Sequence, residues 1–361
     1  MKFTEDFRNE GLVNKLLAQI RRISKRPIRI MEVCGGHTMA IRKYGIHDLL
    51  PPTIDLLSGP GCPVCVTDQH FIDLAISYAK QPHNILLIYG DLLRVPGSYS
   101  SLDHEKAKGA DIRIIYSTIQ ALEVARYNPD KKIIFVAIGF ETTVPGTALA
   151  ILQAFGENLK NFYIISAHKT MPEAMESLIE EGIPIDGYIG PGHVSSITGS
   201  KIFMPLAEKY HIPVVISGFE PVDILQSVMM VSSMIEEGRS GVEIQYKRLV
   251  SVEGNRKAQK LVQEVFEPCT LKWRGMGEIP GSGLRLRKKY QNHDAVIQIP
   301  VKVTSGAEPK GCICGQILKG MKKPVDCALF GKKCTPSNPV GACMVSTEGA
   351  CQAYFNYQSV I

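Results

Sequence analysis

The stretch "KIIFVAIGFE", residues 132–141, decides the fold class that this sequence predicts. Its long apolar run, rich in β-branched residues, is typical of a strand that is buried on both faces. Helical segments follow most such runs, and strands that alternate with helices predict βαβ units and parallel sheets. Seven similar runs lie in the first two thirds of the chain: "IRIMEVCGG", "TIDLLSGPG", "NILLIYGD", "IRIIYST", "NFYIISAH", "IDGYIGPGH" and "IPVVISGFE".

The chain has 361 residues, enough for two or three domains. We interpret the eight strands as two similar parallel-sheet α/β domains of Rossmann-like architecture, which meet near residues 127–132. From Gly311 onward cysteine, glycine and proline dominate, so we expect a domain there that is held by metal or covalent links. The expected ranges are 1–50 for an N-terminal helix with the first strand, 51–130 and 131–235 for the two α/β domains, and 236–361 for the cysteine-rich domain.

Charge and composition exclude several classes of protein. The net charge of +6 is spread along the chain, and the densest basic run, residues 284–290, is interpreted as a solvated face rather than a nucleic-acid site. No apolar stretch is long enough to span a membrane, and the first residues lack the apolar core of a signal peptide, so we expect a cytoplasmic protein. Ten cysteines in such a protein indicate metal or redox chemistry rather than structural disulfides.

Polar and glycine-rich motifs follow the predicted strands. Because the carboxyl ends of parallel strands meet at one edge of a sheet, we expect these motifs to converge on a crevice. They are "CGGH" (34–37), "GPGCPVC" (59–65), "GFETT" (139–143), "SAHKT" (166–170), "GPGH" (190–193) and "GFEP" (218–221).

Six cysteines gather between residues 312 and 351, and four of them have the spacing C-x14-C-x6-C-x16-C: Cys312, Cys327, Cys334 and Cys351. Four thiolates suit zinc or an iron–sulfur cluster. Zinc ribbons use C-x2-C pairs, which this segment lacks, so we favour a [4Fe-4S] cluster and keep a zinc staple as the alternative. Cys314 and Cys343 are left over, and the spacing leaves open whether Cys314 replaces Cys312 as a ligand.

Cys62 and Cys65 form a C-x2-C pair, which is either half of a zinc site, a redox dithiol or two core cysteines. We favour the dithiol, because Pro63 stiffens the turn and a helix that begins near Thr67 or Asp68 would lower a thiol pKa. The flanking "GPG" predicts an exposed loop rather than a core position.

Cys34 and His37 follow the first strand at a spacing that can bind a soft or borderline metal. A packed cysteine beside a hydrogen-bonded histidine is the ordinary alternative, and the metal hypothesis gains weight if Cys34 meets Cys62 and Cys65. Glu141 lies on the turn after residues 132–139, where a helix cap is the commoner role for such a residue than catalysis.

The combination of motifs resembles a known family. "CGGHTMAI", "GPGCPVCV", "GFETTVP", "GPGHVSSITG" and the terminal C-x14-C-x6-C-x16-C spacing occur in the order found in the HypD family of [NiFe]-hydrogenase maturation factors. The resemblance covers essentially the whole chain. It implies two α/β domains and an iron–sulfur domain.

The resemblance also implies a function. With the small protein HypC, the chain would be an assembly scaffold rather than a conventional turnover enzyme. On it an iron ion would receive two cyanides and one carbon monoxide, Fe(CN)2CO, for the hydrogenase large subunit. Cyanide would come from HypE, after HypF has prepared its precursor from carbamoyl phosphate.

The resemblance further assigns roles to residues. Cys34 would hold the iron, with the redox-active thiols Cys62 and Cys65 close to it, and His37 and Glu141 would line the same crevice. The cluster ligands would be Cys312, Cys327, Cys334 and Cys351, with Cys314 and Cys343 as a thiol pair that relays electrons. The alternative is a cluster-dependent thiol–disulfide oxidoreductase resembling ferredoxin–thioredoxin reductase, which has no need of a third thiol beside a histidine.

Overall fold

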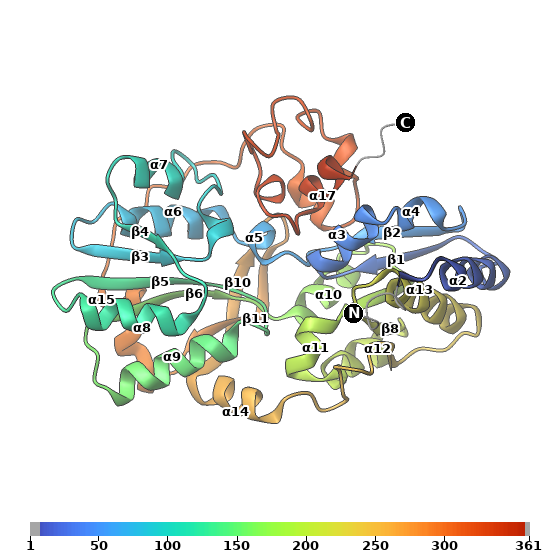
Figure 1. Ribbon diagram of the computed structural model, residues 1–361, viewed down its shortest axis with the longest axis horizontal. Coiled ribbons are helices and arrows are strands. Elements are labelled where there is room, and N and C mark those ends of the chain that lie inside the picture. The colour runs from blue at the N-terminus through green and yellow to red at the C-terminus, as the bar shows by residue number, and fades with distance from the viewer. Residues whose placement is uncertain (1–7, 358–361) are drawn as a thin grey trace.

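The computed structural model describes residues 8–357, so the outermost positions of the expected ranges 1–50 and 236–361 lie outside the described residues. Two parallel sheets form the two halves of an elongated molecule (Figure 1). The first sheet has the order β2 (Ile54–Ser58), β1 (Ile28–Glu32), β7 (Gly187–Pro191), β8 (Val214–Ser217) and β9 (Val242–Ile244). The second has the order β4 (Ile112–Ile114), β3 (Asn84–Ile88), β5 (Lys132–Gly139) and β6 (Phe162–His168).

The eight strands expected from apolar runs are all present, as β1 to β8, and every pairing within the two sheets is parallel. Strand β3 is buried along its whole length, and β5 is buried after its first residue. This burial explains why the runs are continuous rather than alternating, because helices cover both faces of each sheet. The α/β class is therefore confirmed, and the two halves are consistent with Rossmann-like domains.

The strands are distributed between the sheets differently from the ranges 51–130 and 131–235. Strands β1 and β2 share one sheet with β7, β8 and β9, which come much later in the chain. Strands β3 to β6 form the other sheet. Residues 127–132 thus lie inside one half, where Lys132 begins β5 beside β3, rather than between two domains. Apolar runs report that a strand is buried, but they carry no information about which strand it pairs with.

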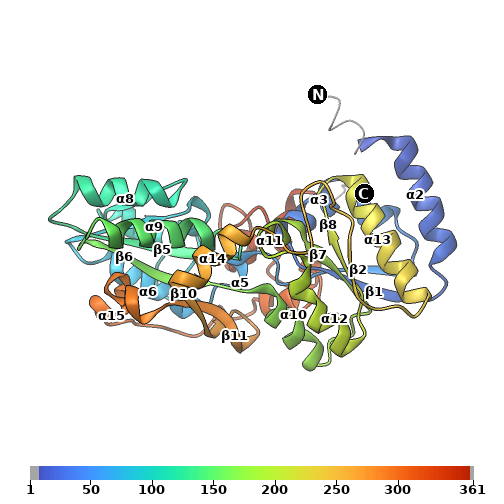
Figure 2. The ribbon, with the colours of Figure 1, turned by 90° about the horizontal axis from the view of Figure 1, so that it is seen from below.

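Helices cover both faces of each sheet, and the views in Figures 1 and 2 agree on their placement. One face of the first sheet packs against α2, α3 and α13, and one face of the second packs against α8 and α9. Leu16, Leu17 and Ile20 form the buried side of the expected N-terminal helix. The helices are α2 (Glu10–Ile23), α3 (Gly35–Lys43), α4 (Ile46–Leu49), α5 (Pro63–Val66), α6 (Gln69–Ala79), α7 (Leu102–Ala107), α8 (Thr118–Tyr127), α9 (Val144–Gly156), α10 (Met171–Glu180), α11 (Gly192–Thr198), α12 (Met204–Tyr210), α13 (Pro221–Glu236), α14 (Arg256–Val265), α15 (Ala295–Gln298), α16 (Cys314–Leu318) and α17 (Ala350–Asn356). The short 3-10 helices are η2 (Gly90–Leu92), η3 (Ser200–Phe203), η4 (Lys288–His293), η5 (Pro324–Asp326) and η6 (Ala342–Met344).

An antiparallel hairpin of β10 (Phe266–Trp273) and β11 (Gly277–Leu286) lies between the two halves (Figures 1 and 2). Helix α14 directly precedes this hairpin. Bridges join Trp273 to Thr67 and Gly283 to Lys169, so the hairpin pairs with loops that follow β2 and β6. It therefore connects motifs from both sheets.

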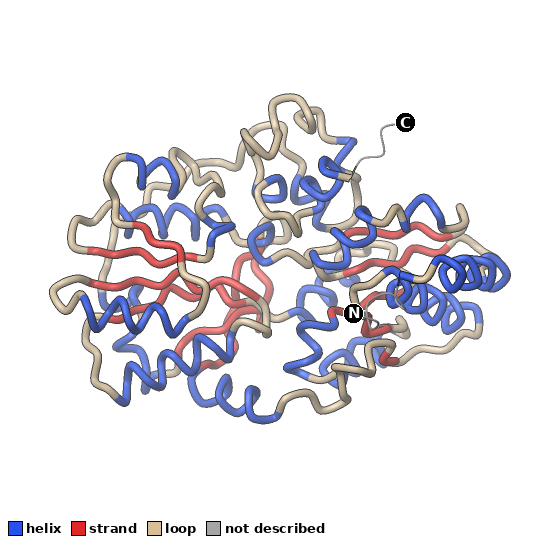
Figure 3. The backbone as a smooth tube through the Cα atoms, viewed as in Figure 1, coloured by secondary structure: helices blue, strands red, loops and turns tan. Residues whose placement is uncertain are grey.

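The cysteine-rich segment, residues 311–357, consists mainly of turns and loops around α16, η5, η6 and α17 (Figure 3). It lies across the junction of the two halves (Figure 1). Helix α17 packs on α3, and η6 packs on α5. Among residues 8–357, no helix combines the length and the apolar character needed to cross a membrane.

Candidate metal and thiol centre

The "CGGH" and "GPGCPVC" motifs lie side by side at the carboxyl ends of β1 and β2. The backbone N–H of Gly35 donates to the carbonyl of Gly61 over 2.9 Å. A Cβ atom at Gly61 would stand 2.2 Å from the backbone nitrogen of Cys34, so only glycine permits this approach. The expected convergence of the two motifs is thus present at the level of the backbone.

Cys34 occupies the N-cap position of α3 and is buried. Its backbone N–H donates to Glu32 Oε2 over 3.1 Å, and the Thr38 hydroxyl donates to the other oxygen of Glu32. Burial raises the pKa of the Cys34 thiol to about 12, and the nearby carboxylate of Glu348 acts in the same direction. Burial also raises the pKa of Glu32 to about 8. The free thiol is therefore neutral, and a metal that binds it must displace a proton.

His37 lies in a stack of three rings. Its ring stacks on Phe219 with centroids 4.7 Å apart, and Phe219 stacks on His193 at 4.0 Å. His37 Nε2 lies 3.0 Å from the carbonyl oxygen of Gly218, so Nε2 carries the hydrogen and Nδ1 is an acceptor. Burial lowers the pKa of His37 to about 4, which keeps the ring neutral. Nδ1 is buried without a hydrogen-bond partner among the described residues, so its lone pair is free.

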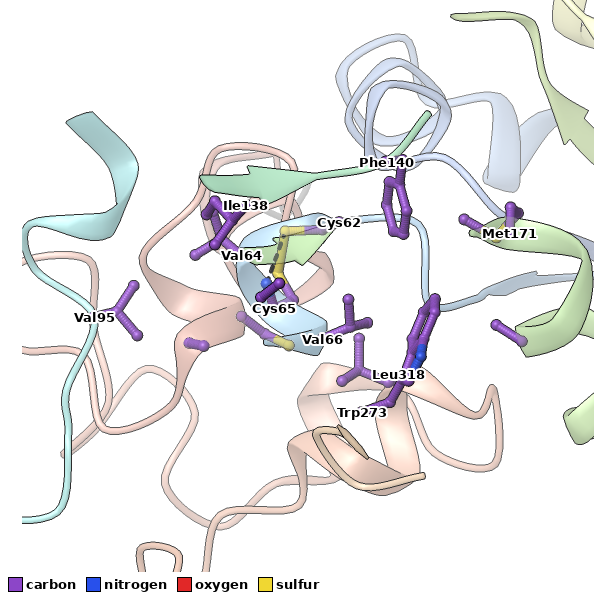
Figure 4. Close-up of a cluster of buried hydrophobic side chains, with 14 of the residues drawn as sticks. Cys62, Val64, Cys65, Val66, Val95, Ile138, Phe140, Met171, Trp273 and Leu318 are labelled. Carbon is purple, nitrogen blue, oxygen red and sulfur yellow. Dashed lines mark hydrogen bonds between the residues drawn. A yellow bond between two sulfur atoms is a disulfide. The ribbon is translucent and has the colours of Figure 1, made fainter. Parts of the chain in front are cut away.

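Cys62 and Cys65 form a disulfide at the start of α5, with Cα atoms 5.2 Å apart (Figure 4). The prediction of an exposed loop is wrong here, because both residues are buried. Phe140 and Trp273 lie near this pair in Figure 4, since the hairpin and the turn after β5 cover the motif. The expected helix after the motif is α6, and Asp68 is its N-cap as anticipated.

Glu141 caps a helix. Its Oε1 accepts the backbone N–H of Met171 at the start of α10 over 2.9 Å, and its Oε2 is buried without a partner among residues 8–357. Burial raises the pKa of Glu141 to about 7, with a smaller contribution from Glu173. Next to it in the fold, Lys169 is 1% exposed and lies over the Trp273 ring, and burial lowers its pKa to about 7. Glu141 thus has the structural role that its position predicts, together with an oxygen free to bind a proton or a ligand.

The C-terminal cysteines gather around one pocket, hereafter the cysteine pocket. Apolar side chains from α16, η6 and the loop before η6 complete its wall. Cys343 does not line this pocket, and its thiol interacts with those of Cys314 and Cys351. The cysteines that line the pocket are Cys312, Cys314, Cys327, Cys334 and Cys351.

The residues of the cysteine pocket suit an iron–sulfur cluster. A Cβ at Gly341 would stand 2.5 Å from Cys314 Sγ and 2.8 Å from Cys312 Sγ, so glycine keeps the space above these sulfurs open. Among residues 8–357, no three His, Cys, Asp or Glu side chains are close enough together to hold a single ion. Cysteine thiolates gathered around one pocket are the donor set that a [4Fe-4S] cluster uses. The Sγ atoms of Cys312 and Cys314 are 3.2 Å apart, and either can serve as the fourth ligand.

The three centres adjoin. Helix η6, which contains Cys343, packs on α5, which contains Cys65. A Cβ at Gly35 would meet the Glu348 backbone oxygen at 2.6 Å, so the cysteine-rich segment also rests on the "CGGH" loop. One continuous apolar cluster includes Cys62 and Cys65 together with Cys314, Cys343 and Cys351.

Several residues of this site are missing from the sequence prediction. Glu32 and Glu348 flank the Cys34 thiol, and Phe219 orders His37. Of these, Phe219 could have been found, because "GFEP" is one of the motifs that follow a strand. No spacing in the chain connects Glu348 with Cys34, which lie far apart in sequence.

The chain is similar in sequence to known proteins over nearly its whole length. The sequence model HypD, described as "Hydrogenase formation hypA family", matches residues 11–358. The proteins named hydrogenase maturation factor HypD from Rhodobacter capsulatus and from Azotobacter vinelandii are each 46% identical to this chain; the alignments cover 99% of this chain and 98% and 97% of those proteins. The protein of the same name from Cupriavidus necator is 43% identical over 99% of this chain and 97% of its own length.

These relatives place the chain among the factors that mature hydrogenases. The chain belongs to the HypD family.

Proposed function

We propose that this chain, together with HypC, is the scaffold on which the Fe(CN)2CO group of a [NiFe]-hydrogenase is assembled in the cytoplasm. The observation that carries the proposal is the meeting of three sulfur centres. The loop of Cys34 contacts the loop of Cys62 and Cys65, and the cysteine-rich segment packs on both. Family membership supports a role in hydrogenase maturation, and this packing supports the more specific scaffold.

Cys34 is the proposed holder of the iron, which is the cargo of the scaffold. Cyanide and carbon monoxide favour low-spin Fe(II), a soft centre that a thiolate binds well. Binding exchanges the thiol proton for iron. Glu32, whose Oε2 accepts the Cys34 N–H, has a pKa raised to about 8, so it keeps its proton near neutral pH and adds no negative charge beside the thiol. The neutral ring of His37 offers its free Nδ1 to the same crevice.

Cys62 and Cys65 are the proposed redox-active thiols beside the iron and, when reduced, are further sulfur donors for it. Reduction of their disulfide takes two electrons and two protons and gives two thiols. The proposed path of the electrons runs through η6, because η6 packs on α5 and its Cys343 interacts with Cys314. We propose that Cys312, Cys327, Cys334 and Cys351 hold a [4Fe-4S] cluster, which supplies electrons one at a time when bound.

The proposed partners follow from the same scheme. HypC docks to complete the iron site, HypE delivers cyanide prepared with HypF, and the hydrogenase large subunit receives the product indirectly. We also propose that Glu141, whose buried Oε2 has no hydrogen-bond partner among residues 8–357, lines this crevice.

The Cys62–Cys65 disulfide, adjacent to the cysteine pocket, also favours a second function. The chain would then be a cluster-dependent thiol–disulfide oxidoreductase resembling ferredoxin–thioredoxin reductase. Burial argues against it, because Cys65 is 0% exposed and a protein disulfide cannot reach a buried sulfur. The scaffold is therefore the better-supported function.

The test is infrared spectroscopy of anaerobic protein purified with HypC, together with counts of iron, zinc and sulfide. We expect cyanide and carbon monoxide bands in the parent protein. Cys34→Ala removes the bands and keeps the cluster absorbance, whereas Cys327→Ala removes the cluster absorbance. Cys269→Ala, a free cysteine on β10 outside both centres, keeps both signals.

Other outcomes separate the alternatives. If zinc is the only metal found, the cysteine pocket is a structural zinc site and not a cluster site. Absent infrared bands, with turnover of a disulfide substrate, would favour the oxidoreductase.

A further inference from the structure

The tip of the β10–β11 hairpin carries a buried arginine that the proposed function does not use. Arg274 directly follows β10 and is 4% exposed. Its backbone N–H donates to the carbonyl of Val66 and its Nε to the carbonyl of Thr67, each over 2.9 Å. These two acceptors directly follow Cys65, so the backbone and the side chain of Arg274 are both held by the segment just after the "GPGCPVC" motif.

The described residues satisfy the guanidinium of Arg274 only in part. Its Nη2 is buried without a hydrogen-bond partner among the described residues. Within residues 8–357, no carboxylate lies at ion-pair distance from it. Burying an unpaired cation costs free energy. A negative group is therefore expected beside Arg274, and no carboxylate of the described residues provides it.

The cysteine sulfurs that lie near the tip of the hairpin can supply this negative charge. The next residue, Gly275, packs on Gly315, which follows Cys314: a Cβ at Gly275 would stand 2.2 Å from the Gly315 Cα. Cys312 and Cys314, which precede Gly315, both line the cysteine pocket. Arg274 thus lies between the segment that follows Cys65 and the cysteine pocket.

We propose that Arg274 is a positioning residue whose fixed charge balances the negative sulfur centre of the cysteine pocket and favours the uptake of an electron there. The inference rests on the proposed function, since it takes the pocket to hold the cluster. Each electron accepted adds one negative charge, and a nearby cation in a buried site stabilises the reduced state. Because the Thr67 carbonyl accepts from the guanidinium and the Val66 carbonyl accepts the Arg274 backbone N–H, Arg274 links the pocket to the segment beside the Cys62–Cys65 pair.

The test compares Arg274→Met, which keeps bulk in a buried site but removes the charge, with Arg274→Lys, which keeps the charge. The full-length proteins are titrated anaerobically with dithionite and redox mediators, and reduction is followed by visible absorbance and electron paramagnetic resonance. Iron and sulfide are counted in each sample. Arg287→Gln is the matched control, because Arg287 lies just beyond the same hairpin and its Nε also donates to a carbonyl, that of Gln263.

At a fixed potential, we expect the ratio of reduced to oxidised cluster to fall by at least about threefold in Arg274→Met, because one buried charge acts at short range. Arg274→Lys and the control should remain close to the parent protein. A cluster that is lost in Arg274→Met but retained in Arg274→Lys also supports charge balance.

Equal shifts or equal cluster loss in Arg274→Met and Arg274→Lys would show a purely steric role and overturn the inference, as would unchanged titrations with full cluster content. A parent protein without iron and sulfide would instead overturn the proposed function, which keeps the two failures distinct.

Discussion

At the scale of single residues, burial keeps the groups of this site neutral. Glu32 and Cys34 have raised pKa values and His37 has a lowered one, and burial is the largest cause in each case. In the proposed assembly of Fe(CN)2CO, such neutral surroundings mean that charge enters only with the iron and its ligands. The same effect makes proton movement accompany each binding or redox step.

Lys169 shows how this burial affects stability. Its pKa falls to about 7 from the ordinary 10.5, mainly through burial. Between these values the unfolded chain binds a proton that the folded chain does not, so the free energy of unfolding rises with pH from about 7 to about 10.5. We expect Lys169→Met to remove this part of the rise, measured by urea unfolding at several pH values. Lys132→Met, at the exposed start of β5, should retain it, and an unchanged slope in Lys169→Met would contradict the prediction.

At the scale of elements, the turn of the β10–β11 hairpin fits against the cysteine-rich segment with no spare volume. Gly275 and Gly277 both have positive φ, 73° and 81°. A Cβ at Gly275 would collide with the Gly315 backbone, whereas a Cβ at Gly277 would meet nothing within 4 Å. The two glycines therefore separate backbone strain from steric contact.

Gly275→Ala and Gly277→Ala should both lose about 1 kcal/mol of stability from the left-handed backbone conformation. Gly275→Ala should lose a further ~1–3 kcal/mol, because the hairpin must move away from α16. Chemical unfolding with circular dichroism measures both variants. Equal losses would mean that the hairpin and the cysteine-rich segment are not tightly packed.

At the scale of the whole molecule, the cysteine-rich segment joins the two halves. Its helix α17 docks on α3 through Tyr354, which is 7% exposed and has the Arg42 guanidinium 3.4 Å from its ring centroid. Its η6 docks on α5, which follows β2 and leads toward the other sheet. If these two contacts were lost, the cysteine pocket would move away from the loops of Cys34 and of Cys62 and Cys65.

Tyr354→Ala should release the segment locally. Truncation of a buried aromatic side chain costs about 3–5 kcal/mol, and opening of the segment should increase accordingly. Limited proteolysis with mass spectrometry should cut residues 311–357 at least about tenfold faster than in the parent chain. Tyr357→Ala, at the partly exposed end of α17, is the control and should cleave at the parent rate. Comparable cleavage in both variants would mean that Tyr354 does not hold the segment.

The amino-acid sequence alone determined the eight strands and the family. Apolar runs such as residues 132–139 are readable because burial on both faces selects the same residue types wherever the strand lies. Asp68 at the start of α6 was readable because an N-cap depends on its own few neighbours. The cysteine spacings and the motif order likewise indicated the family that the comparisons confirm.

Only the tertiary structure decided how strands sort between sheets, how deeply Cys62 and Cys65 are buried, and which charges surround each thiol. Strand pairing joins Ile30 of β1 to Gly187 of β7, far away in the sequence, and no local pattern encodes such a partner. Glu348 acts on Cys34, and Arg274 acts on Cys312, through space rather than along the chain. Local periodicity reports burial, whereas pairing and electrostatics depend on distances that exist only once the chain has folded.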